Sequence, residues 1–349
     1  MLPERRPGVQ RPTSGPLVDA FGRVHTYLRV SVTDRCNYRC AYCMPAAGLD
    51  WMKREDLLTY EEIARIVTAL ARCGIVRIRL TGGEPTVRKG LPDLVARLAA
   101  IEGITDIAMT TNGHLFAKDA AVFARAGLRR LNVSIDSLDP VQFKRLTRGG
   151  DLARVLDSVA AARDQGLVPV KINAVIIGNE NEDQVDAMVD HFASDAATTQ
   201  VRFIEYMPFS ALADGVAQGQ SWKHVAASRL RERLAKRWTL EPVDVSQGSG
   251  PAKHWRLVES GLIVGFISPI TEHFCESCNR LRLQADGHLR TCLSREAAPS
   301  LRDVIRAGIT DEALEQALRE RVWGKIAGHD AHELGSGLAF DGAMTSVGG

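Results

Sequence analysis

Short runs rich in β-branched residues alternate with amphipathic segments between residues 26 and 207. Helices are predicted between the runs, for example at 61–74 and at 119–127, where Gly127 stands as a helix stop. This alternation predicts an α/β fold with a parallel sheet wrapped by helices. Six strand–helix units are two short of a complete barrel, so we expect a partial TIM-type barrel. The predicted strands cover residues 26–33, 75–81, 105–112, 128–136, 169–177 and 200–207.

One face of these predicted strands is apolar and the other is polar. The apolar face, with Val30, Ile78 and Leu131 among its residues, should meet the helices. A closed barrel normally fills its interior with branched aliphatic residues. A polar interior therefore predicts an open cavity for a polar, anionic ligand, unless each arginine is simply paired with an acidic residue. The polar positions are Arg29, Ser31, Thr33, Arg77, Arg79, Thr81, Thr110, Asn112, Asn132, Ser134, Asp136, Lys171 and Asn173.

The pattern changes after residue 208. A loop leads to a basic helix predicted over 221–238, whose charged run 229–237 is expected to be a solvated face. A strand and turn follow at 241–255. Residues 262–292 are expected to form short antiparallel strands, with a hairpin turn at 285–287. Two more helices are predicted at 301–308 and 311–324, before a polar tail that ends in two glycines.

Composition excludes several classes of protein. The 349 residues are 45% hydrophobic, with 44 basic and 42 acidic side chains, which is typical of a globular protein rather than a disordered or collagen-like chain. A net charge of +2 gives no reason to expect nucleic acid or a membrane surface as partner. No apolar run approaches the ~18 residues of a membrane span. The basic N-terminus is not followed by an apolar signal core, so we expect a cytoplasmic location.

Three of the seven cysteines, Cys36, Cys40 and Cys43, follow the first predicted strand in one loop. In a barrel, this is the end at which active sites lie. Structural zinc normally takes four protein ligands. Three thiolates instead suit a 4Fe–4S cluster with one iron open to a ligand. Zinc with His25 as fourth ligand is the alternative.

A second group of three, Cys275, Cys278 and Cys292, reaches its last member across the predicted hairpin. Spacing alone leaves a second cluster and a zinc site, with His273 or His288 as fourth ligand, equally open. The seventh cysteine, at position 73, follows an apolar helix and is most simply a buried small residue.

Two arginines follow the second group at once. On a strand, Arg280 and Arg282 face the same side, and paired guanidinium groups suit phosphate oxygens. Surface ion pairs are the alternative role for both.

The segment CNYRCAYC, with GGEP after the second predicted strand, resembles the radical S-adenosylmethionine (SAM) enzymes. In that superfamily, the open iron chelates the methionine part of SAM, and one electron then yields a 5′-deoxyadenosyl radical. Glycine pairs allow a close backbone approach, here expected to be toward the ligand.

A wider set of motifs is similar to the GTP 3′,8-cyclase family within that superfamily. These are SVTDRCNYRCAYCMP, RLTGGEPTVR, TTNG, RRLNVSIDSL, RFIEYM, FCESCNRLRLQADGHLRTCL and the terminal Gly-Gly, so the likeness covers about residues 15–349. It implies the first step of molybdenum cofactor biosynthesis. The radical abstracts the C3′ hydrogen of GTP, C3′ attacks C8 of guanine, and reduction gives (8S)-3′,8-cyclo-7,8-dihydroguanosine 5′-triphosphate.

The resemblance also implies site residues, two 4Fe–4S clusters and SAM as cofactors. Cys36, Cys40 and Cys43 would hold the cluster that binds SAM, and Cys275, Cys278 and Cys292 the cluster that touches guanine. Contacts to SAM would come from Tyr42, Gly83, Ser134 and Met207. Contacts to GTP would come from Arg29, Arg79, Thr110, Lys171, Arg280, Leu281 and Arg282. The tail, Gly348 and Gly349, is expected to enter the cavity because glycine has no side chain to clash there.

The expected organisation is an extended segment (1–20), a radical SAM partial barrel (21–208) and an auxiliary-cluster region with the tail (209–349). The resemblance implies a homodimer, an external one-electron reductant, and transfer of the product to cyclic pyranopterin monophosphate synthase. Two rival functions stay open. One is a peptide-modifying radical enzyme, although such enzymes usually use more cysteines. The other is a zinc-stabilised nucleotide-binding regulator, which metal content would distinguish.

Overall fold

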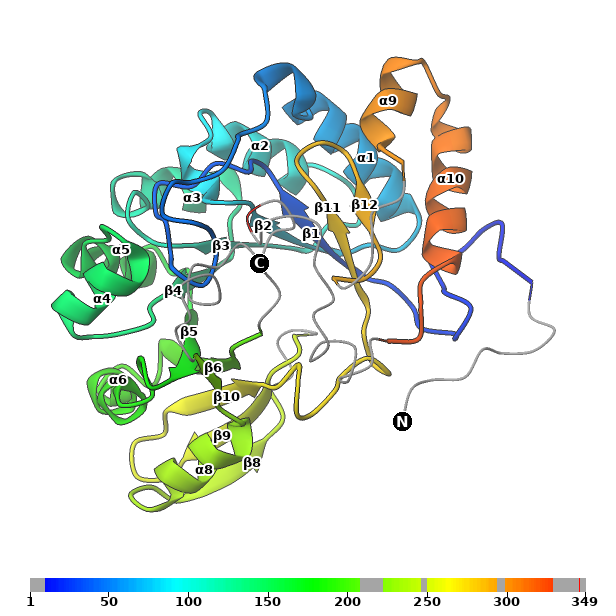
Figure 1. The fold of residues 1–349 in the computed structure, drawn as a ribbon. Helices are drawn as coiled ribbons and strands as arrows, with labels where there is room; N and C mark the ends of the chain where they lie inside the picture. Colours follow the sequence, from blue (N-terminus) through cyan, green and yellow to red (C-terminus); the bar gives the residue numbers. More distant parts are fainter. Residues whose placement is uncertain (1–9, 208–221, 246–249, 294–298, 329–344, 346–349) are drawn as a thin grey trace.

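The computed structural model describes residues 10–207, 222–245, 250–293, 299–328 and 345 (Figure 1). All six predicted strands of the repeat are present. With those of the C-terminal part, the strands are β1 (Tyr27–Ser31), β2 (Arg77–Thr81), β3 (Asp106–Thr111), β4 (Arg130–Ser134), β5 (Val170–Gly178), β6 (Thr199–Glu205), β7 (Lys223–His224), β8 (Leu240–Val243), β9 (Lys253–Leu257), β10 (Ile263–Ile267), β11 (Arg280–Leu283) and β12 (Leu289–Arg290).

One curved sheet contains all of these strands except β7, in the order β12-β11-β1-β2-β3-β4-β5-β6-β10-β9-β8. Strands β1 to β6 are parallel to their neighbours, as the strand–helix alternation predicts. β7 pairs with β5 outside this order. The order runs from β12 to β8, which are the two ends of an open sheet rather than neighbours in a closed barrel.

The prediction of antiparallel strands over residues 262–292 is wrong in part. β10 and β11 each extend the sheet in parallel, β10 beside β6 and β11 beside β1. Both strands satisfy the backbone groups that would otherwise line the edges of the six-stranded sheet. The outer pairs, β11 with β12, β10 with β9 and β9 with β8, are antiparallel. The predicted hairpin at 285–287 is confirmed, because it joins β11 to β12 and Gly287 has a φ of 90°.

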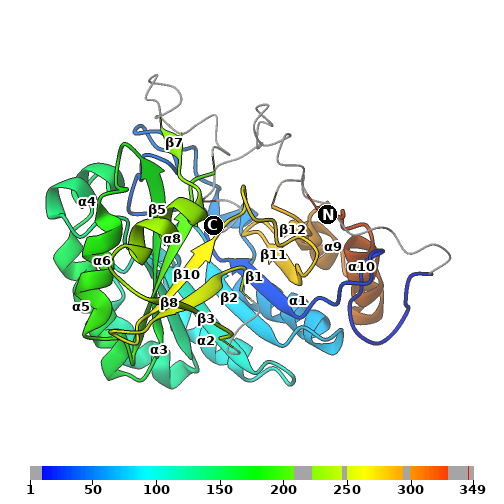
Figure 2. The same ribbon diagram turned by 90° about the horizontal axis from the view of Figure 1, so that it is seen from below.

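Helices cover the outer side of the curved sheet (Figure 1). The predicted stop at Gly127 is confirmed, since this residue caps α3 with a φ of 108°. The turned view in Figure 2 shows α9 and α10 beside β12 and α1. The helices are α1 (Tyr60–Arg72), α2 (Leu91–Ala99), α3 (Ala120–Ala126), α4 (Pro140–Thr147), α5 (Leu152–Asp164), α6 (Gln184–Ala193), α8 (Ala227–Ala235), α9 (Leu301–Arg306) and α10 (Asp311–Trp323), with 3-10 turns η1 (Arg54–Asp56), η2 (Pro85–Val87) and η3 (Ala117–Asp119).

The main core lies between the helices and the apolar side of the strands. Val30, Ile78 and Leu131 are fully buried there, as the alternation of apolar and polar positions predicts. α1 begins with a capping box in which Thr59 and Glu62 exchange hydrogen bonds, and its apolar residues Ile63, Ile66 and Leu70 face this core. The polar positions of the same strands consequently face the inside of the curve.

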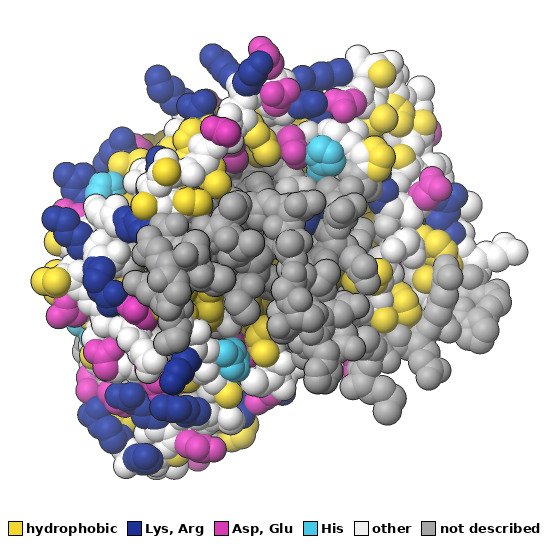
Figure 3. All heavy atoms as spheres, viewed as in Figure 1, with side chains coloured by type: hydrophobic (Ala, Val, Ile, Leu, Met, Phe, Trp, Pro, Cys, Tyr) yellow, Lys and Arg dark blue, Asp and Glu magenta, His cyan; other side chains and the backbone are white. Residues whose placement is uncertain are grey.

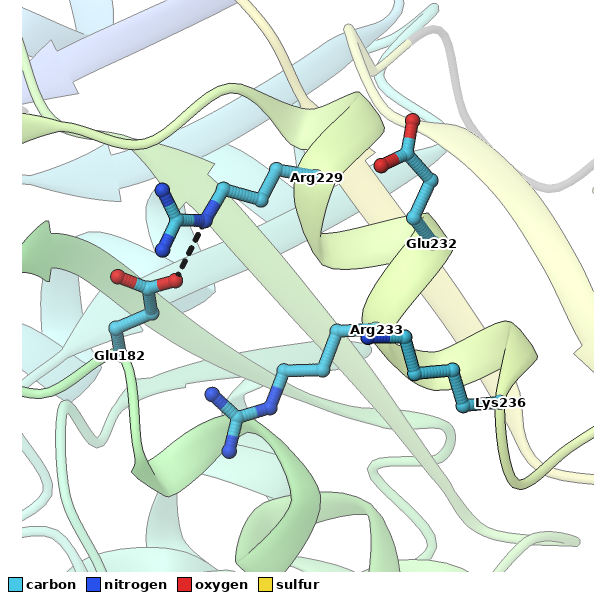
Figure 4. A pocket seen from close by; sticks show the side chains of 5 residues that line it. All are labelled: Glu182, Arg229, Glu232, Arg233 and Lys236. Carbon is cyan, nitrogen blue, oxygen red and sulfur yellow. Dashed lines mark ion pairs between the residues drawn. The ribbon is translucent and has the colours of Figure 1, made fainter.

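The charged run 229–237 is more than a solvated face. Arg229 pairs with Glu182 at 2.9 Å and Arg233 with Asp186 at 2.7 Å, so α8 is tied to α6 and the residues before it (Figure 4). A surface hollow lies at this joint, lined by Glu182, Arg229, Glu232, Arg233 and Lys236.

Basic and acidic side chains are intermixed over the outer helices in the space-filling view of Figure 3. Across the described residues, no helix combines the length and apolar character needed to cross a bilayer.

Candidate active site

A row of basic residues crosses the inner face of the sheet where β11, β1 and β2 lie side by side. In the strand register, Arg29 stands between Arg282 and Arg79. Arg79 donates to the Tyr27 hydroxyl and, at 3.3 Å, to the hydroxyl of Thr110. Burial and then the charge of Arg282 lower the pKa of Arg29 well below its ordinary value. The predicted positions Arg29, Arg79, Thr110 and Arg282 are therefore brought together.

Lys171 and Arg202 continue this basic lining on β5 and β6. Arg202 donates to the side-chain oxygen of Asn173 at 3.0 Å. Burial, followed by the charge of Arg202, lowers the pKa of Lys171 to about 6. Burial, followed by the charge of Arg79, lowers the pKa of Arg202 to about 9. Two sets of cations thus act on one another across the curve of the sheet.

Sequence reasoning missed Arg202 and His254 as candidate residues. Arg202 alternates with the buried Val201 and Phe203, so strand parity could have found it. His254 could not have been found in this way, because its position depends on β9 pairing with β10. A Cβ at Gly265 would lie 3.0 Å from both the Arg202 and the His254 side chains, so the absence of a side chain there lets these two approach. Burial and then the charge of Arg202 lower the pKa of His254 to about 4.

The three thiols of the first cysteine loop lie in an acidic environment. Burial, then Glu84, raises the pKa of Cys36 to about 11. Burial, then Cys36 and Asp136, raises the pKa of Cys43 to about 12, and Cys40 is raised well above its usual value for similar reasons. Thiols that oppose one another's ionisation need a cation before all three can be thiolates. The donor set fits an iron–sulfur cluster, whose irons supply that charge.

The Gly82-Gly83-Glu84 segment clamps the first cysteine loop. The Gly83 amide donates to the Thr33 carbonyl at 2.8 Å, and a Cβ at Gly83 would lie 2.3 Å from the Arg35 carbonyl oxygen. Glu84 is buried and accepts hydrogen bonds from the Asn112 amide and the Thr111 hydroxyl at the end of β3. The glycines thus permit a close approach to the chain's own backbone just before Cys36.

Tyr42 and Ser134 lie near the carboxyl ends of the strands. Tyr42 donates to Asp136 at 2.6 Å, and Asp136 also accepts from the Val175 amide at 2.9 Å. Burial raises the pKa of Asp136 to about 6. Ser134 ends β4, and Met207 follows β6, both partly exposed. These positions share the end of the sheet that carries the first cysteine loop.

The second cysteine loop lies in a basic environment. Arg23 donates to the carbonyl oxygen of Cys275 at 2.8 Å and is itself paired with Asp19 at 2.6 Å. Lys325 donates to the sulfur of Cys278 at 3.6 Å. Burial alone would raise the pKa of Cys278, but the charges of Arg280 and Lys325 lower it to about 6. Burial lowers the pKa of Lys325, and Cys278 opposes that shift. The basic surroundings therefore favour the thiolate form of Cys278, which is the form that binds a metal.

The histidines weighed as zinc ligands have other partners. His25 is buried and its Nε2 lies 3.0 Å from Asp19, while His288 lies 3.0 Å from Asp286. His273 Nδ1 lies 3.1 Å from the Pro269 carbonyl oxygen. In the described ranges, no three Cys, His, Asp or Glu side chains converge on one point as a metal site would require. The chemistry of the thiols, rather than a preformed metal cage, indicates the clusters.

Leu281 and the terminal Gly-Gly are predicted site residues that the structure does not place on the polar face of the sheet. Leu281 directs its side chain to the apolar side, where it is fully buried beside Leu28, so only its backbone is open to a ligand. Gly348 and Gly349 lie outside the described residues.

Two family models together match most of the chain. The model of the radical SAM superfamily matches residues 30–192, and the model named Molybdenum Cofactor Synthesis C matches residues 199–331. The first match includes the first cysteine loop, and the second includes the other cysteine loop and the two arginines that follow it.

Similar proteins of known name identify the family within the radical SAM superfamily. A GTP 3′,8-cyclase of Mycobacterium sp. (strain KMS) is 44% identical over 331 residues, which are 95% of this chain and 93% of the relative. A GTP 3′,8-cyclase of Hydrogenovibrio crunogenus is 41% identical over 334 residues, 95% of this chain and 99% of the relative. The chain belongs to the GTP 3′,8-cyclase family. It is a radical SAM enzyme of molybdenum cofactor biosynthesis, and the family uses SAM and two 4Fe–4S clusters.

Solved structures agree on the fold. The structure of Streptococcus suis SuiB bound to S-adenosylmethionine aligns with a TM-score of 0.57, covering 85% of this chain and 68% of SuiB at 16% identity. SuiB bound to the precursor peptide SuiA aligns with a TM-score of 0.58, also at 16% identity. At this identity the likeness concerns the fold alone, and it supports the partial barrel expected for the family. The zinc-regulator alternative is not supported by any of these comparisons.

Proposed function

We propose that the inner face of the curved sheet binds GTP between the two cysteine loops and holds it for conversion to (8S)-3′,8-cyclo-7,8-dihydroguanosine 5′-triphosphate. One observation carries this proposal. Lys171 and Arg202 are buried basic groups whose pKa values are lowered by burial and by neighbouring cations. A polyanion would relieve that repulsion, and a triphosphate offers the charge and the number of acceptor oxygens that such a lining requires.

The residues of the basic lining are assigned different contacts with GTP. Arg29 and Arg79 from neighbouring parallel strands, with Arg282 beside them, present guanidinium groups that suit bidentate contact with phosphate oxygens. Arg280 follows the second cysteine loop and is assigned to the same nucleotide. Thr110 already accepts a hydrogen bond from Arg79, so its hydroxyl hydrogen is available to the ligand. Leu281 contributes through its backbone only.

We assign Cys36, Cys40 and Cys43 to the cluster that binds SAM, and Cys275, Cys278 and Cys292 to the second cluster. When bound, the first cluster and SAM supply the 5′-deoxyadenosyl radical. Tyr42, Gly83, Ser134 and Met207 are assigned to SAM, because Tyr42 lies in the first loop and the other three lie at the carboxyl ends of β2, β4 and β6. The protein residues themselves orient the nucleotide, so that the ribose stays within reach of the radical.

Calorimetric titration of GTP tests the anion site. Lys171→Met removes a buried amine that becomes charged beside the triphosphate, and should weaken GTP binding by about tenfold or more, the value of a charge-assisted contact. Lys118→Met, at an exposed position near α3, is the matched control and should leave the affinity unchanged. Equal affinity of wild type and Lys171→Met for GTP would contradict the assignment.

The same titration should also show that the protein takes up a proton when GTP binds. Lys171 has a pKa of about 6 before the anion arrives, so it is mostly neutral at pH 7.5. An adjacent triphosphate favours the charged form and raises that pKa, so binding should take up a proton. Titrations at pH 7.5 in buffers of different ionisation enthalpy measure this uptake. It should shrink in the Lys171→Met variant and vanish toward pH 5, where the lysine is already protonated.

Iron and acid-labile sulfide analysis of anaerobically purified protein tests the clusters. Wild type should hold about eight irons, and a variant with Cys275, Cys278 and Cys292 all changed to Ala should hold about four. If the wild type holds only about four irons and the variant loses zinc, the second site is a structural zinc site.

The family likeness supports further proposals about partners. We infer a homodimer, an external one-electron reductant, and transfer of the product to cyclic pyranopterin monophosphate synthase. We also infer a cytoplasmic location, because open-iron clusters and free thiols suit a reducing compartment. The molar mass measured by light scattering tests the dimer directly.

A further inference from the structure

Basic side chains contact the second cysteine loop from three directions. Lys325 follows α10, is 3% exposed, and donates to the Cys278 sulfur at 3.6 Å and to the Arg280 carbonyl oxygen at 2.8 Å. Arg280 donates to the same sulfur at 3.7 Å, and its guanidinium lies 4.7 Å from the centre of the Phe274 ring. One sulfur therefore has two cationic donors, and the loop carbonyl of Cys275 has a third in Arg23.

A purely structural role does not explain Lys325 well. Burying a lysine is costly unless its charge is compensated. Among the residues that the structure describes, Lys325 forms no ion pair with a carboxylate, and its hydrogen-bond acceptors are a sulfur and a carbonyl oxygen. A neutral side chain of the same length would fill the space at lower cost. A cysteine that holds a cluster binds it as a thiolate, so Cys278, 3.6 Å from the Lys325 ammonium, would supply the compensating negative charge.

We propose that Lys325 is a positioning residue for the second cluster, and that its charge makes this cluster the easier of the two to reduce. This inference rests on the proposed assignment of the six cysteines to two clusters. A cluster becomes more negative when it accepts an electron, so a fixed positive charge and an N–H···S hydrogen bond beside it stabilise the reduced form. The reduction potential of the second cluster is raised as a result.

The first loop supplies the contrast. Glu84 adjoins this loop, because its amide donates to the Arg35 carbonyl oxygen at 2.8 Å, and Asp136 accepts the hydroxyl of Tyr42, the residue before Cys43, at 2.6 Å. Carboxylates at these two places disfavour added negative charge on the first cluster. One electron from a low-potential donor should consequently reside on the second cluster before the first is reduced.

The test is a redox titration of the holoenzyme with dithionite, followed by electron paramagnetic resonance. Wild type should show two reduction steps, and the step at higher potential should be missing from the triple alanine variant of Cys275, Cys278 and Cys292. Lys325→Met should lower the equilibrium constant for that step by about tenfold, which is 59 mV for a one-electron couple. Lys325→Arg should restore it. Lys236→Met, at an exposed position, should change neither step.

Each outcome decides the proposal. An unchanged upper step in Lys325→Met, with the iron content intact, would overturn it. If Lys325→Met loses the second cluster, Lys325→Gln decides, because glutamine keeps a donor for the Arg280 carbonyl but has no charge. A lowered step in Lys325→Gln supports the proposal, and an unchanged step overturns it. If both neutral variants lose about four irons, retention by Lys325→Arg supports a role for the charge, and loss there too overturns it.

Failure of the proposed assignment of six cysteines to two clusters would give a different result from failure of the Lys325 proposal. A wild type that binds only about four irons would remove the second cluster altogether, whatever the Lys325 variants do.

Discussion

The two cysteine loops have the same number of thiols but opposite electrostatic surroundings. In the first loop, Glu84 adds to the effect of burial, and the pKa of Cys36 rises to about 11. In the second, Arg280 and Lys325 outweigh burial, and the pKa of Cys278 falls to about 6. Residue spacing does not reveal this electrostatic difference. The difference lies in side chains that other parts of the chain bring to each loop.

This difference shows how each loop is held. The first loop is held by other parts of the barrel, through the backbone amides of Gly83 and Glu84 and through Arg148, which donates to the carbonyl oxygens of Arg39 and Met44. The second is fixed by residues distant in sequence, since Arg23 comes from the N-terminal segment and Lys325 from the end of the described chain. Each loop should therefore respond to its own set of substitutions.

The largest expected effect comes from Arg23→Met. Arg23 is paired with Asp19 and donates to the carbonyl oxygens of Cys275, Ile326 and Ala327. Removing one partner of a buried pair leaves the other charge uncompensated, at a cost of about 3–5 kcal/mol in the free energy of unfolding. Denaturant unfolding should record that loss, and iron analysis should show the second cluster depleted before the first.

Arg11→Met is the matched control for this change. Arg11 and Glu320 lie 3.7 Å apart with the glutamate well exposed, so the pair should contribute less than about 1 kcal/mol. Equal depletion of both clusters in Arg23→Met would show that the two loops are not held separately.

A smaller effect is expected from Gly83→Ala, which acts on the first loop. The new Cβ would lie 2.3 Å from the Arg35 carbonyl oxygen and 2.5 Å from that of Asp34, so the backbone ahead of Cys36 must shift. Such overpacking costs about 1–3 kcal/mol. Iron content should fall by about half, with the second cluster retained.

Gly250→Ala serves as its control, because a Cβ there meets no atom within 4 Å. If Gly83→Ala kept all its iron and bound SAM normally, the clamp would have no role in holding the first loop.

Much of this organisation follows from sequence pattern. The alternation of apolar and polar positions predicts the parallel strands and the inward placement of Arg29 and Lys171, because each strand needs only local periodicity. The direction of β10 and β11 does not follow from it. Short strands at the end of a chain can pair either way, and the edge strand that they meet decides the outcome.

The candidate site shows the same limit. Cysteine spacing indicates two metal-binding groups, and the family resemblance assigns a cluster to each. The residues that distinguish them, Arg23 and Lys325, lie about 250 and 50 positions from Cys278 and have no motif of their own. His254 is another such residue, since only the pairing of β9 with β10 brings it toward Arg202. Contacts made by tertiary pairing are not visible in a local pattern.

The smallest and most specific effect is expected from Asp136→Asn. Asp136 is buried, accepts the Tyr42 hydroxyl, and helps to raise the pKa of Cys43. Replacing its charge with an amide should make the first cluster easier to reduce, by up to about tenfold in the equilibrium constant. The two reduction steps would move closer together, as in Lys325→Gln, but here because the lower step rises rather than because the upper step falls. Asp157→Asn, on the exposed side of α5, should leave both steps unchanged.

The pH dependence identifies the responsible charge. Asp136 has a pKa of about 6, so it is ionised at pH 8 and mostly protonated at pH 5. The reduction potential of the first cluster in the wild type should accordingly rise, relative to that in the variant, as the pH falls through 6. Protonation of Asp136 removes the same charge as the substitution. Wild type and Asp136→Asn should then agree at pH 5 and differ at pH 8. A difference that persists unchanged at pH 5 would assign the effect to altered packing around Tyr42 rather than to the acidic surroundings of the first loop.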